Sequence, residues 1–384
     1  MRVLHLTSIY PTKSKPNNPV IKDLIHNLNY LCDNDVIISK KVPLPFSAGR
    51  YHSDERIVGH FGLPYGLFAR TRLASISRNT LRMYAEECSS YEVIHAHTLV
   101  DGKAALDISR SFGIPYVVSL RNTCISQIKT LLTARSVYLQ ILEEASSIIT
   151  ISQVLKKEIS DFLEKKGRSA LIERVRVVPN AIDESVVKMK DKSTSDSVKL
   201  VTACNLIKRK NVERLIKAFS LICKRQKNCQ LEIIGDGTQR KRLQKLVESL
   251  QLDDSVVFLG SLPRWKVLTK FDEADLFVMV SLKETFGMVY LEALARGLPI
   301  IWSENRGIDG LFRECVGIAT NPKKVQKIGE AIVSVVGDLQ YYTSNVRRFQ
   351  ENEIKDYFFS STVKTIFSLY NSVLLKRSGN RLFG

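Results

Sequence analysis

The sequence predicts an α/β protein made of two Rossmann-like, doubly wound domains that face each other. Its 384 residues correspond to two or three domains at about 150 residues per domain. Short runs rich in Val and Ile, mostly apolar on both faces, alternate with helical stretches, which is typical of buried parallel strands. Ligands of such folds bind beyond the carboxyl ends of the strands, so we expect the active site in the cleft between the domains. The expected strands are residues 3–8, 36–40, 92–96, 116–120, 147–151, 175–178, 199–203, 230–234, 256–259, 276–280 and 299–302.

A polar segment separates the two sets of strands. Residues 188–197 (KMKDKSTSDS) contain almost no apolar side chain, and we interpret them as part of an interdomain linker. We therefore expect an N-terminal domain over residues 1–187, a linker over 188–198 and a C-terminal domain over 199–355.

Composition excludes several classes of protein. Hydrophobic residues make up 44% of the chain and charged residues 25%, which is enough apolar material for ordered cores and excludes wholesale disorder. No stretch reaches ~18 apolar residues, which argues against a membrane span. The seven cysteines are scattered without a C-x-x-C pair, so we expect neither a disulfide framework nor a zinc site. The N-terminus lacks a signal-peptide pattern, and we expect a cytoplasmic protein.

The net charge of +18 is spread over the chain. Residues 1–195 hold 27 Lys and Arg against 19 Asp and Glu, a net of +8, and the remaining residues hold 30 against 20, a net of +10. A diffuse positive field favours anionic partners such as nucleotides or acidic lipid headgroups, although it could serve solubility alone. The even division argues against a nucleic-acid-binding protein.

The most informative segment is 277–299 (FVMVSLKETFGMVYLEALARGLP). A strand is expected to end near Ser281, and a helix to run from about Gly287 to Gly297. The unpaired N–H groups at the start of that helix suit a diphosphate. Glu284 and Glu292 could hold a sugar and a ribose diol by paired hydrogen bonds, although two acids eight residues apart also occur on ordinary surfaces.

This frame of strand, acid, helix and second acid resembles the E-x7-E motif of the family 4 retaining glycosyltransferases, which have the GT-B architecture of two facing Rossmann-like domains. The similarity continues in the family's order along almost the whole chain. It implies a retaining transferase, with the nucleotide-sugar donor held mainly by the C-terminal domain and the acceptor by the N-terminal domain. It also implies a C-terminal helix, residues 356–384, that packs back on the N-terminal domain. The supporting segments are 94–97 (IHAH), 115–121 (PYVVSLR), 178–183 (VPNAID), 200–211 (LVTACNLIKRKN), 231–237 (LEIIGDG) and 257–260 (VFLG).

The resemblance assigns roles to individual residues. Lys210 and the helix start would neutralise the leaving diphosphate, Glu284 would orient the sugar and Glu292 would hold the ribose. The donor would be UDP- or GDP-linked, with no metal or other cofactor. The donor-binding residues implied in this way are Asn205, Lys210, Glu284, Phe286, Gly287, Met288, Val289 and Glu292.

Four positions depart from the family pattern. Cys204 and Asn205 stand where the family has a glycine and an arginine in the diphosphate loop, and Asn211 stands for the glycine after the lysine. Arg121 occupies a position where many members have a histidine, which puts a histidine role there in doubt.

Histidine and arginine at strand ends are further candidates. All six histidines lie in the first 97 residues, so a histidine base must come from the N-terminal domain. His95 and His97 fall on one side of a strand end, where they could line the cleft or simply pack. Arg121 ends the next strand and could bind donor phosphate or an anionic acceptor. We take His97 and Arg121, with Lys210 and Glu284, as the candidate catalytic residues.

Three other patterns favour plain structural explanations. The Asp-x-Asp sequence at 33–35 fits turn chemistry better than a metal site. The glycines of 235–240 (GDGTQR) fit a tight turn better than a dinucleotide fingerprint. Residues 63–84 join an aromatic loop to a basic amphipathic helix with Arg70, Arg78 and Arg82. This is slightly more typical of a surface helix than of weak contact with anionic inner-leaflet lipid.

The combined interpretation is a cytoplasmic retaining glycosyltransferase, with weak peripheral binding at the inner face of the membrane as an open alternative to a fully cytoplasmic location. Its acceptor would be a glycan, lipid-linked, in cell-surface polysaccharide or lipopolysaccharide biosynthesis. The alternatives are a nucleotide-sugar epimerase of the same architecture and a non-catalytic sugar-nucleotide binder, the latter because of Asn205 and Asn211.

Overall fold

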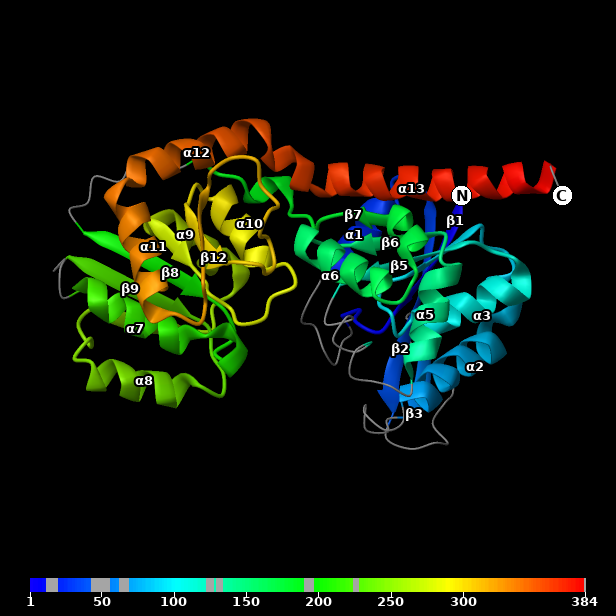
Figure 1. Ribbon diagram of the computed structural model, residues 1–384, viewed down its shortest axis with the longest axis horizontal. Coiled ribbons are helices and arrows are strands. Elements are labelled where there is room, and N and C mark those ends of the chain that lie inside the picture. Colours follow the sequence, from blue (N-terminus) through cyan, green and yellow to red (C-terminus); the bar gives the residue numbers. More distant parts are fainter. Residues whose placement is uncertain are drawn as a thin grey trace. The chain divides into compact units, whose positions relative to one another are not determined.

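The computed structural model describes residues 1–11, 20–42, 56–61, 69–121, 128, 134–189, 197–223 and 228–382, which form two compact units (Figure 1). Unit 1 comprises Met1–Ile151, Leu155–Ala181 and Phe359–Gly384, and unit 2 comprises Ser152–Val154 and Ile182–Phe358. Each unit is built on one parallel sheet, as the apolar runs predicted.

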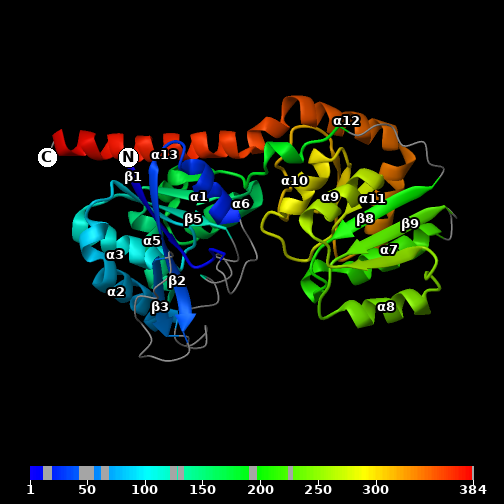
Figure 2. The same ribbon diagram turned by 180° about the vertical axis from the view of Figure 1, so that it is seen from behind.

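Within the described residues, unit 1 holds a seven-stranded sheet in the order β3-β2-β1-β4-β5-β6-β7. Every pair of neighbours is parallel. Helices α2, α3 and α5 lie on one face of the sheet, and α1 and α13 lie on the other (Figure 2). The strands are β1 (Arg2–Thr7), β2 (Asp33–Val42), β3 (Arg56–Phe61), β4 (Val93–Ala96), β5 (Tyr116–Leu120), β6 (Ser147–Thr150) and β7 (Val175–Val177). The helices are α1 (Val20–Leu28), α2 (Ala69–Cys88), α3 (Gly102–Phe112), α5 (Arg135–Glu144), α6 (Gln153–Glu164), η3 (Ser169–Arg174) and α13 (Phe359–Leu382).

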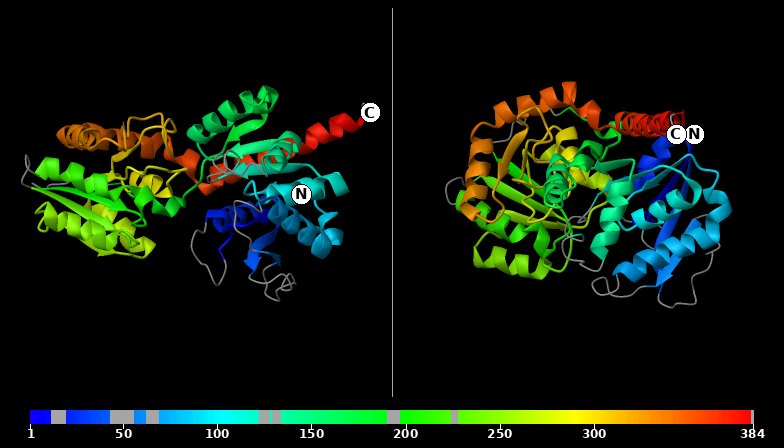
Figure 3. Two further views of the ribbon diagram at one scale, coloured as in Figure 1. Left: turned by 60° about the horizontal axis from the view of Figure 1, so that its bottom comes forward. Right: turned by 45° about the vertical axis from the view of Figure 1, so that its right-hand side comes forward.

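Unit 2 holds a six-stranded parallel sheet in the order β10-β9-β8-β11-β12-β13. Helices α7, α8 and α11 cover one face, and α9, α10 and α12 lie on the other (Figure 3). The strands are β8 (Val198–Ala203), β9 (Cys229–Ile234), β10 (Val256–Gly260), β11 (Leu276–Val278), β12 (Ile300–Ser303) and β13 (Gly317–Thr320). The helices are η4 (Glu184–Val186), η5 (Lys208–Lys210), α7 (Val212–Cys223), α8 (Arg240–Ser249), α9 (Arg264–Glu273), α10 (Met288–Ala295), α11 (Val325–Gly337), α12 (Leu339–Asn352) and η6 (Ile354–Tyr357).

Two strands, β3 and β13, were absent from the sequence prediction. Both are edge strands, and each has neighbours on one side only. Edge strands need less apolar sequence, and here RIVGHF carries Arg, Gly and His while GIAT has four residues. The Asp-x-Asp sequence also lies inside β2 rather than in a turn before it.

Apart from the short stretch Ser152–Val154, which groups with unit 2, the chain passes between the units after Ala181 and after Phe358. The first point precedes the expected linker, of which residues 190–196 lie outside the described part. The last helix, α13, packs on unit 1, where Ile366 and Tyr370 share a core cluster with Leu24 and Leu28 of α1. In the described residues, no helix combines the length and apolar character that crossing a bilayer requires.

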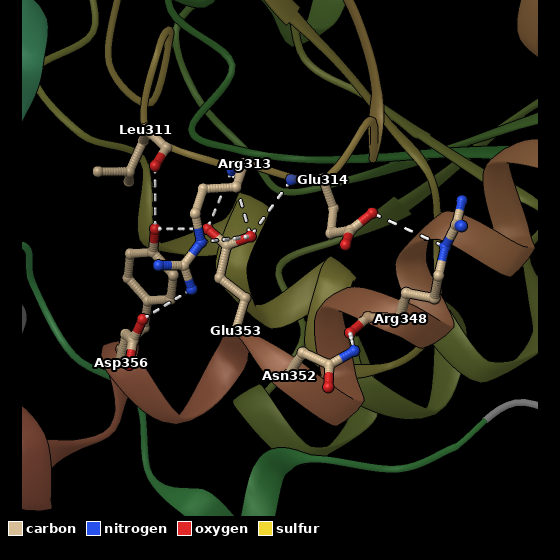
Figure 4. Close-up of polar contacts among 8 residues, drawn as sticks. Leu311, Arg313, Glu314, Arg348, Asn352, Glu353 and Asp356 are labelled. Carbon is tan, nitrogen blue, oxygen red and sulfur yellow. Dashed lines mark hydrogen bonds and ion pairs between the residues drawn. The ribbon is translucent and has the colours of Figure 1, made fainter.

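A buried carboxylate holds the end of unit 2 in place (Figure 4). Glu353, 2% exposed, accepts hydrogen bonds from the backbone N–H groups of Arg313 and Glu314 at 3.1–3.3 Å. The Tyr357 hydroxyl lies 3.2 Å from the same carboxylate and 3.1 Å from the Leu311 carbonyl oxygen. The carbonyl oxygen of Tyr357 in turn accepts a hydrogen bond from the N–H of Ile182, the residue that follows the first crossing point. Glu353 therefore fixes the segment that brings both crossing points together.

Replacing Glu353 by Ala leaves two backbone donors without an acceptor. Each unsatisfied buried group costs about 1–3 kcal/mol, so we expect the free energy of unfolding to fall by about 2 kcal/mol or more. Asp356→Asn is the matched control, because Asp356 is 52% exposed in its pair with Arg313 and such pairs contribute about 0–1 kcal/mol. Urea denaturation of both variants measures the difference, and equal losses would contradict this role for Glu353.

Candidate functional site

The loop after β8 lies against the glycines that follow β9. A Cβ atom on Gly235 would sit 2.0 Å from the Cys204 carbonyl oxygen, and one on Gly237 would sit 2.6 Å from that of Leu206. Leu206 N–H donates to Asp236 O at 2.8 Å. These glycines are therefore required by close backbone packing, which places the loop at the carboxyl end of the sheet. Burial raises the pKa of the Cys204 thiol to about 11, so it is protonated at neutral pH.

Asn211 performs the conformational role of the glycine found in the family pattern. Its φ of 60° is left-handed, a region that asparagine tolerates better than most residues. Its Nδ2 donates to the carbonyl oxygens of Val280 and Pro322 at 2.9 and 2.7 Å. The side chain thus ties the end of η5 to the loop after β11, and with it the position of Lys210.

Lys210 and Glu284 form an ion pair at the centre of this region. Lys210 Nζ lies 2.6 Å from Glu284 Oε2, and the two side chains are 14% and 10% exposed. The Glu284 carbonyl oxygen accepts the Gly307 N–H at 3.2 Å, which anchors the acidic loop to the loop after β12. The structure therefore brings together two of the predicted residues that are 74 positions apart.

Helix α10 begins where the sequence predicted. Gly287 precedes it with φ 89°, and a Cβ atom there would lie 2.6 Å from the Tyr290 ring. Met288 and Val289 form the first turn, whose N–H groups lack partners within the helix. Phe286 is 1% exposed, so its ring belongs to the core and only its backbone remains for donor binding.

Glu292 projects from the second turn of α10 and pairs with Arg264. Arg264 Nε lies 2.9 Å from Glu292 Oε1, with the arginine side chain 51% exposed and the carboxylate 16% exposed. Arg264 was missed by the sequence reasoning, because no local pattern links it to a residue 28 positions away.

Two further cations surround the acidic loop. Arg209 is exposed, and its carbonyl oxygen accepts the Leu282 N–H at 2.9 Å. Arg306 Nε donates to Leu282 O at 3.4 Å. Asn205 is exposed on the loop after β8. The basic run 208–210 is a sequence signal for Arg209, whereas nothing near Arg306 indicated its position.

In unit 1, three histidines form a buried stack. His5, His95 and His97 are fully buried, and the rings of His95 and His97 stack with centroids 4.1 Å apart. His95 engages both ring nitrogens, with Ser119 Oγ at 2.7 Å and Tyr370 OH at 2.6 Å. His95 therefore serves packing, and Tyr370 connects it to α13.

The hydrogen bonds of the stack define the proton positions on His97. Asn34 donates through Nδ2 elsewhere, so its Oδ1 accepts from His5 Nε2 at 2.8 Å. His5 Nδ1 is then an acceptor and receives the His97 Nε2–H at 2.9 Å. His97 Nδ1 consequently carries a lone pair, and no residue that the structure describes hydrogen-bonds to it. Burial lowers the pKa of His97 well below its usual value, which keeps the ring neutral.

Arg121 follows β5, the strand next to β4. Its NH1 donates to Asn180 Oδ1 at 2.7 Å, while its Nε is buried without a partner in the described part of the chain. Burial lowers its pKa to about 10. His97 and Arg121 thus lie at neighbouring strand ends of unit 1, as their sequence positions predicted.

A metal has few possible ligands in the described part of the chain. There, the one group of three suitable side chains is His5, His95 and His97, whose ligand atoms lie within 4.8 Å of one another. Hydrogen bonds occupy both nitrogens of His95, and Arg121 adds positive charge, so the stack does not suit a cation. In the Asp-x-Asp sequence, Asp35 pairs with Arg2 and accepts from the Tyr91 hydroxyl.

The basic helix α2 uses its apolar face inside the protein. Leu73 and Ile76 are buried, and α2 contacts α3 and β3. Arg70, Arg78 and Arg82 are exposed. The apolar face of α2 is thereby used in packing within unit 1, and the preceding residues 62–68 lie outside the described part.

Comparison with known proteins identifies the class. The family model described as glycosyl transferases group 1 matches residues 187–355, and the model described as glycosyltransferase family 4 matches residues 20–186. The protein is a glycosyltransferase with the GT-B fold. More narrowly, the chain belongs to the group 1, family 4 glycosyltransferases, which makes it a retaining enzyme that transfers a sugar from a nucleotide sugar.

Individual relatives are distant. An uncharacterized glycosyltransferase, MJ1607 of Methanocaldococcus jannaschii, is 26% identical in an alignment that covers 73% of this chain and 75% of the length of MJ1607. The next curated relatives match over less than half of their own length. Anabaena HepE in complex with UDP and glucose has a TM-score of 0.69 at 18% identity, covering 97% of this chain and all of HepE. The lipopolysaccharide outer core galactosyltransferase WaaB has a TM-score of 0.72 at 16% identity, covering 98% of this chain and all of WaaB.

The buried histidines predict acid sensitivity of unit 1. Burial lowers the pKa of His5 to about 4 and those of His95 and His97 well below 6.5, so the unfolded chain binds protons first as the pH falls. Stability is then complete above about pH 6.5 and decreases below it, by up to ~1.4 kcal/mol per pH unit for each histidine.

Urea denaturation between pH 7.5 and 4.5 measures this slope. Asp101, whose pKa burial raises, contributes an opposite slope, so the informative quantity is the difference between variant and wild type. His97→Gln should reduce the slope, whereas His26→Gln, at an exposed position, should leave it unchanged. An unaltered slope in His97→Gln would refute the attribution of the acid sensitivity to buried His97.

Proposed function

We propose that this glycosyltransferase takes a UDP-linked hexose and transfers it to a lipid-linked glycan in cell-surface polysaccharide biosynthesis. The observation that carries the donor side of the proposal is the Lys210–Glu284 ion pair beside the start of α10, with Glu292 in the same helix. The complex of the similar HepE with UDP and glucose favours UDP as the nucleotide.

Each donor group has a proposed partner in unit 2. The diphosphate binds the N–H groups at Gly287 and Met288 and the ammonium of Lys210, because a helix start and a cation both favour phosphate. Val289 and the backbone of Phe286 complete this turn, and Asn205 approaches from the loop after β8. Glu292 accepts hydrogen bonds from the ribose diol.

Lys210 and Glu284 have one arrangement without donor, in which they form the ion pair, and a second one when donor is bound. Without donor, each charge neutralises the other at 2.6 Å. An incoming diphosphate competes for the ammonium of Lys210, which releases the Glu284 carboxylate to bind sugar hydroxyls. Donor binding thereby prepares the residue that orients the sugar.

The bond between the sugar and the diphosphate breaks as the acceptor hydroxyl forms the new bond on the same face. Negative charge develops on the leaving oxygen, where Lys210 and the start of α10 stabilise it. The acceptor proton passes to the leaving phosphate. Because these groups supply the positive charge, we propose that no metal ion is required.

The proposed acceptor residues lie in unit 1. His97 presents the Nδ1 lone pair, which suits a hydrogen bond from the acceptor hydroxyl, and Arg121 lies at the adjacent strand end. The net charge of +18 and the exposed Arg70, Arg78 and Arg82 favour an enzyme peripheral at the anionic inner face of the membrane. The lipopolysaccharide galactosyltransferase WaaB, similar in fold, supports a lipid-linked glycan as acceptor.

Donor binding tests the central assignment. UDP at about 100 times its Kd should add about 2.7 kcal/mol of stability, and EDTA should not change this. Lys210→Met should remove most of the UDP effect and lower kcat/KM about 100-fold or more, because stabilisation of the leaving group is lost. Lys208→Met is the matched control, since Lys208 is an exposed cation of the same short helix. Equal behaviour of the two variants would remove Lys210 from the site.

Vesicle flotation tests the membrane location. Binding to vesicles with anionic lipid should exceed binding to neutral vesicles and decrease with salt, because the contact is electrostatic. The double variant Arg78→Gln/Arg82→Gln should bind less than wild type, while a control pair, Lys241→Gln/Lys245→Gln on α8, keeps binding. Flotation that is independent of anionic lipid would contradict the proposal.

A further inference from the structure

Arg121 is a buried cation for which the described residues supply no counter-charge. The residue is 9% exposed, and among the described residues its guanidinium has one hydrogen-bond partner, the neutral side-chain oxygen of Asn180. In the described part of the chain no carboxylate pairs with it, and Nε has no acceptor. The other well-buried basic side chains near functional loops are neutralised, as Lys210 is by Glu284 and Arg296 by Asp272.

An uncompensated buried charge destabilises the folded protein when no ligand is bound. An isolated charge loses its hydration on burial, and this loss amounts to several kcal/mol unless an opposite charge compensates it. The pKa of Arg121, lowered to about 10, expresses that penalty. An apolar side chain would fill the position without it, so the guanidinium is explained by a ligand that brings the missing charge.

The groups beside Arg121 indicate where an anionic ligand would bind. Asn180 holds NH1 and leaves the Nε edge unpaired. His97, on the adjacent strand end, has its own unpartnered Nδ1, which carries a lone pair. Arg121 thus matches a negative oxygen and His97 Nδ1 matches a hydroxyl donor, which are the two kinds of group that an anion bearing a hydroxyl offers.

We propose that Arg121 and Asn180 form a binding site for a phosphate or carboxylate group of the acceptor. The inference rests on the proposed function, because it names the chemistry of the acceptor for that transferase: an anionic glycan or glycosyl phosphate. The diphosphate of the donor is the other possible source of charge. We favour the acceptor because Lys210 and the start of α10, both in unit 2, already serve the diphosphate, whereas Arg121, Asn180 and His97 all belong to unit 1.

The test uses the full chain with inorganic phosphate and UDP as probes, read by thermal unfolding. Phosphate should raise the Tm of Lys210→Met, which lacks the cation of the proposed donor site, and the effect should disappear in the double variant Lys210→Met/Arg121→Met. Arg121→Lys should retain part of it, because the charge remains while the planar fork is lost. UDP should bind Arg121→Met within about twofold of wild type, and phosphate should still stabilise the wild type saturated with UDP.

A stability measurement without anion separates binding from a structural role. Arg121→Met should then unfold at the same temperature as wild type or higher, since an uncompensated charge has been removed. A drop of several degrees would make Arg121 a structural residue and overturn the proposal.

Three further outcomes are decisive. Phosphate stabilisation that persists in the double variant Lys210→Met/Arg121→Met would overturn the site. UDP binding weakened about tenfold in that variant would assign Arg121 to the donor diphosphate and overturn the acceptor assignment. Arg121-dependent phosphate binding in a protein that does not bind UDP would support the anion site while removing the proposed function, so the two can fail separately.

Discussion

The parallel direction of the strands is the constraint on which the rest of this structure depends. In a parallel sheet every carboxyl end lies at the same edge, so loops that are far apart in the chain meet there. In unit 2 this edge unites the loop after β8, which leads to Lys210, with the loop after β11, which carries Glu284. In unit 1 it unites His97 and Arg121, which follow β4 and β5. Each group of polar residues is a consequence of strand direction.

The two units treat buried charge differently. Lys210 and Glu284 compensate each other at 2.6 Å, so the proposed donor site is stable when empty and a diphosphate has to compete with an internal carboxylate. Arg121 has a neutral partner instead, and its charge remains uncompensated among the described residues. A site whose charge is incomplete gains more from an anion than one that is already neutral. This contrast is the physical basis for assigning diphosphate and acceptor anion to different residues.

Two of the departures from the family pattern, Asn211 and Cys204, have local explanations. Asn211 adopts the left-handed backbone of the glycine that it replaces and adds two hydrogen bonds that hold η5 to the loop after β11. Cys204 keeps the close approach to Gly235, because that contact involves its carbonyl oxygen rather than its side chain. These two substitutions therefore preserve the shape of the loop, whereas nothing in the structure explains Asn205 in place of the family's arginine.

The sequence by itself determined the fold class, most of the strands, the start of α10 and the family, because apolar runs, the Gly287 turn and the order of motifs are local features of the chain. Edge strands β3 and β13 escaped prediction, since a strand with one neighbour needs little apolar sequence. Only the tertiary structure decided which side chains meet: Arg264 with Glu292, Asn180 with Arg121, and Tyr370 with His95. It also placed the ring of Phe286 in the core. These pairs are separated by 28 to 275 residues, and what joins them is packing between elements, which no local pattern records.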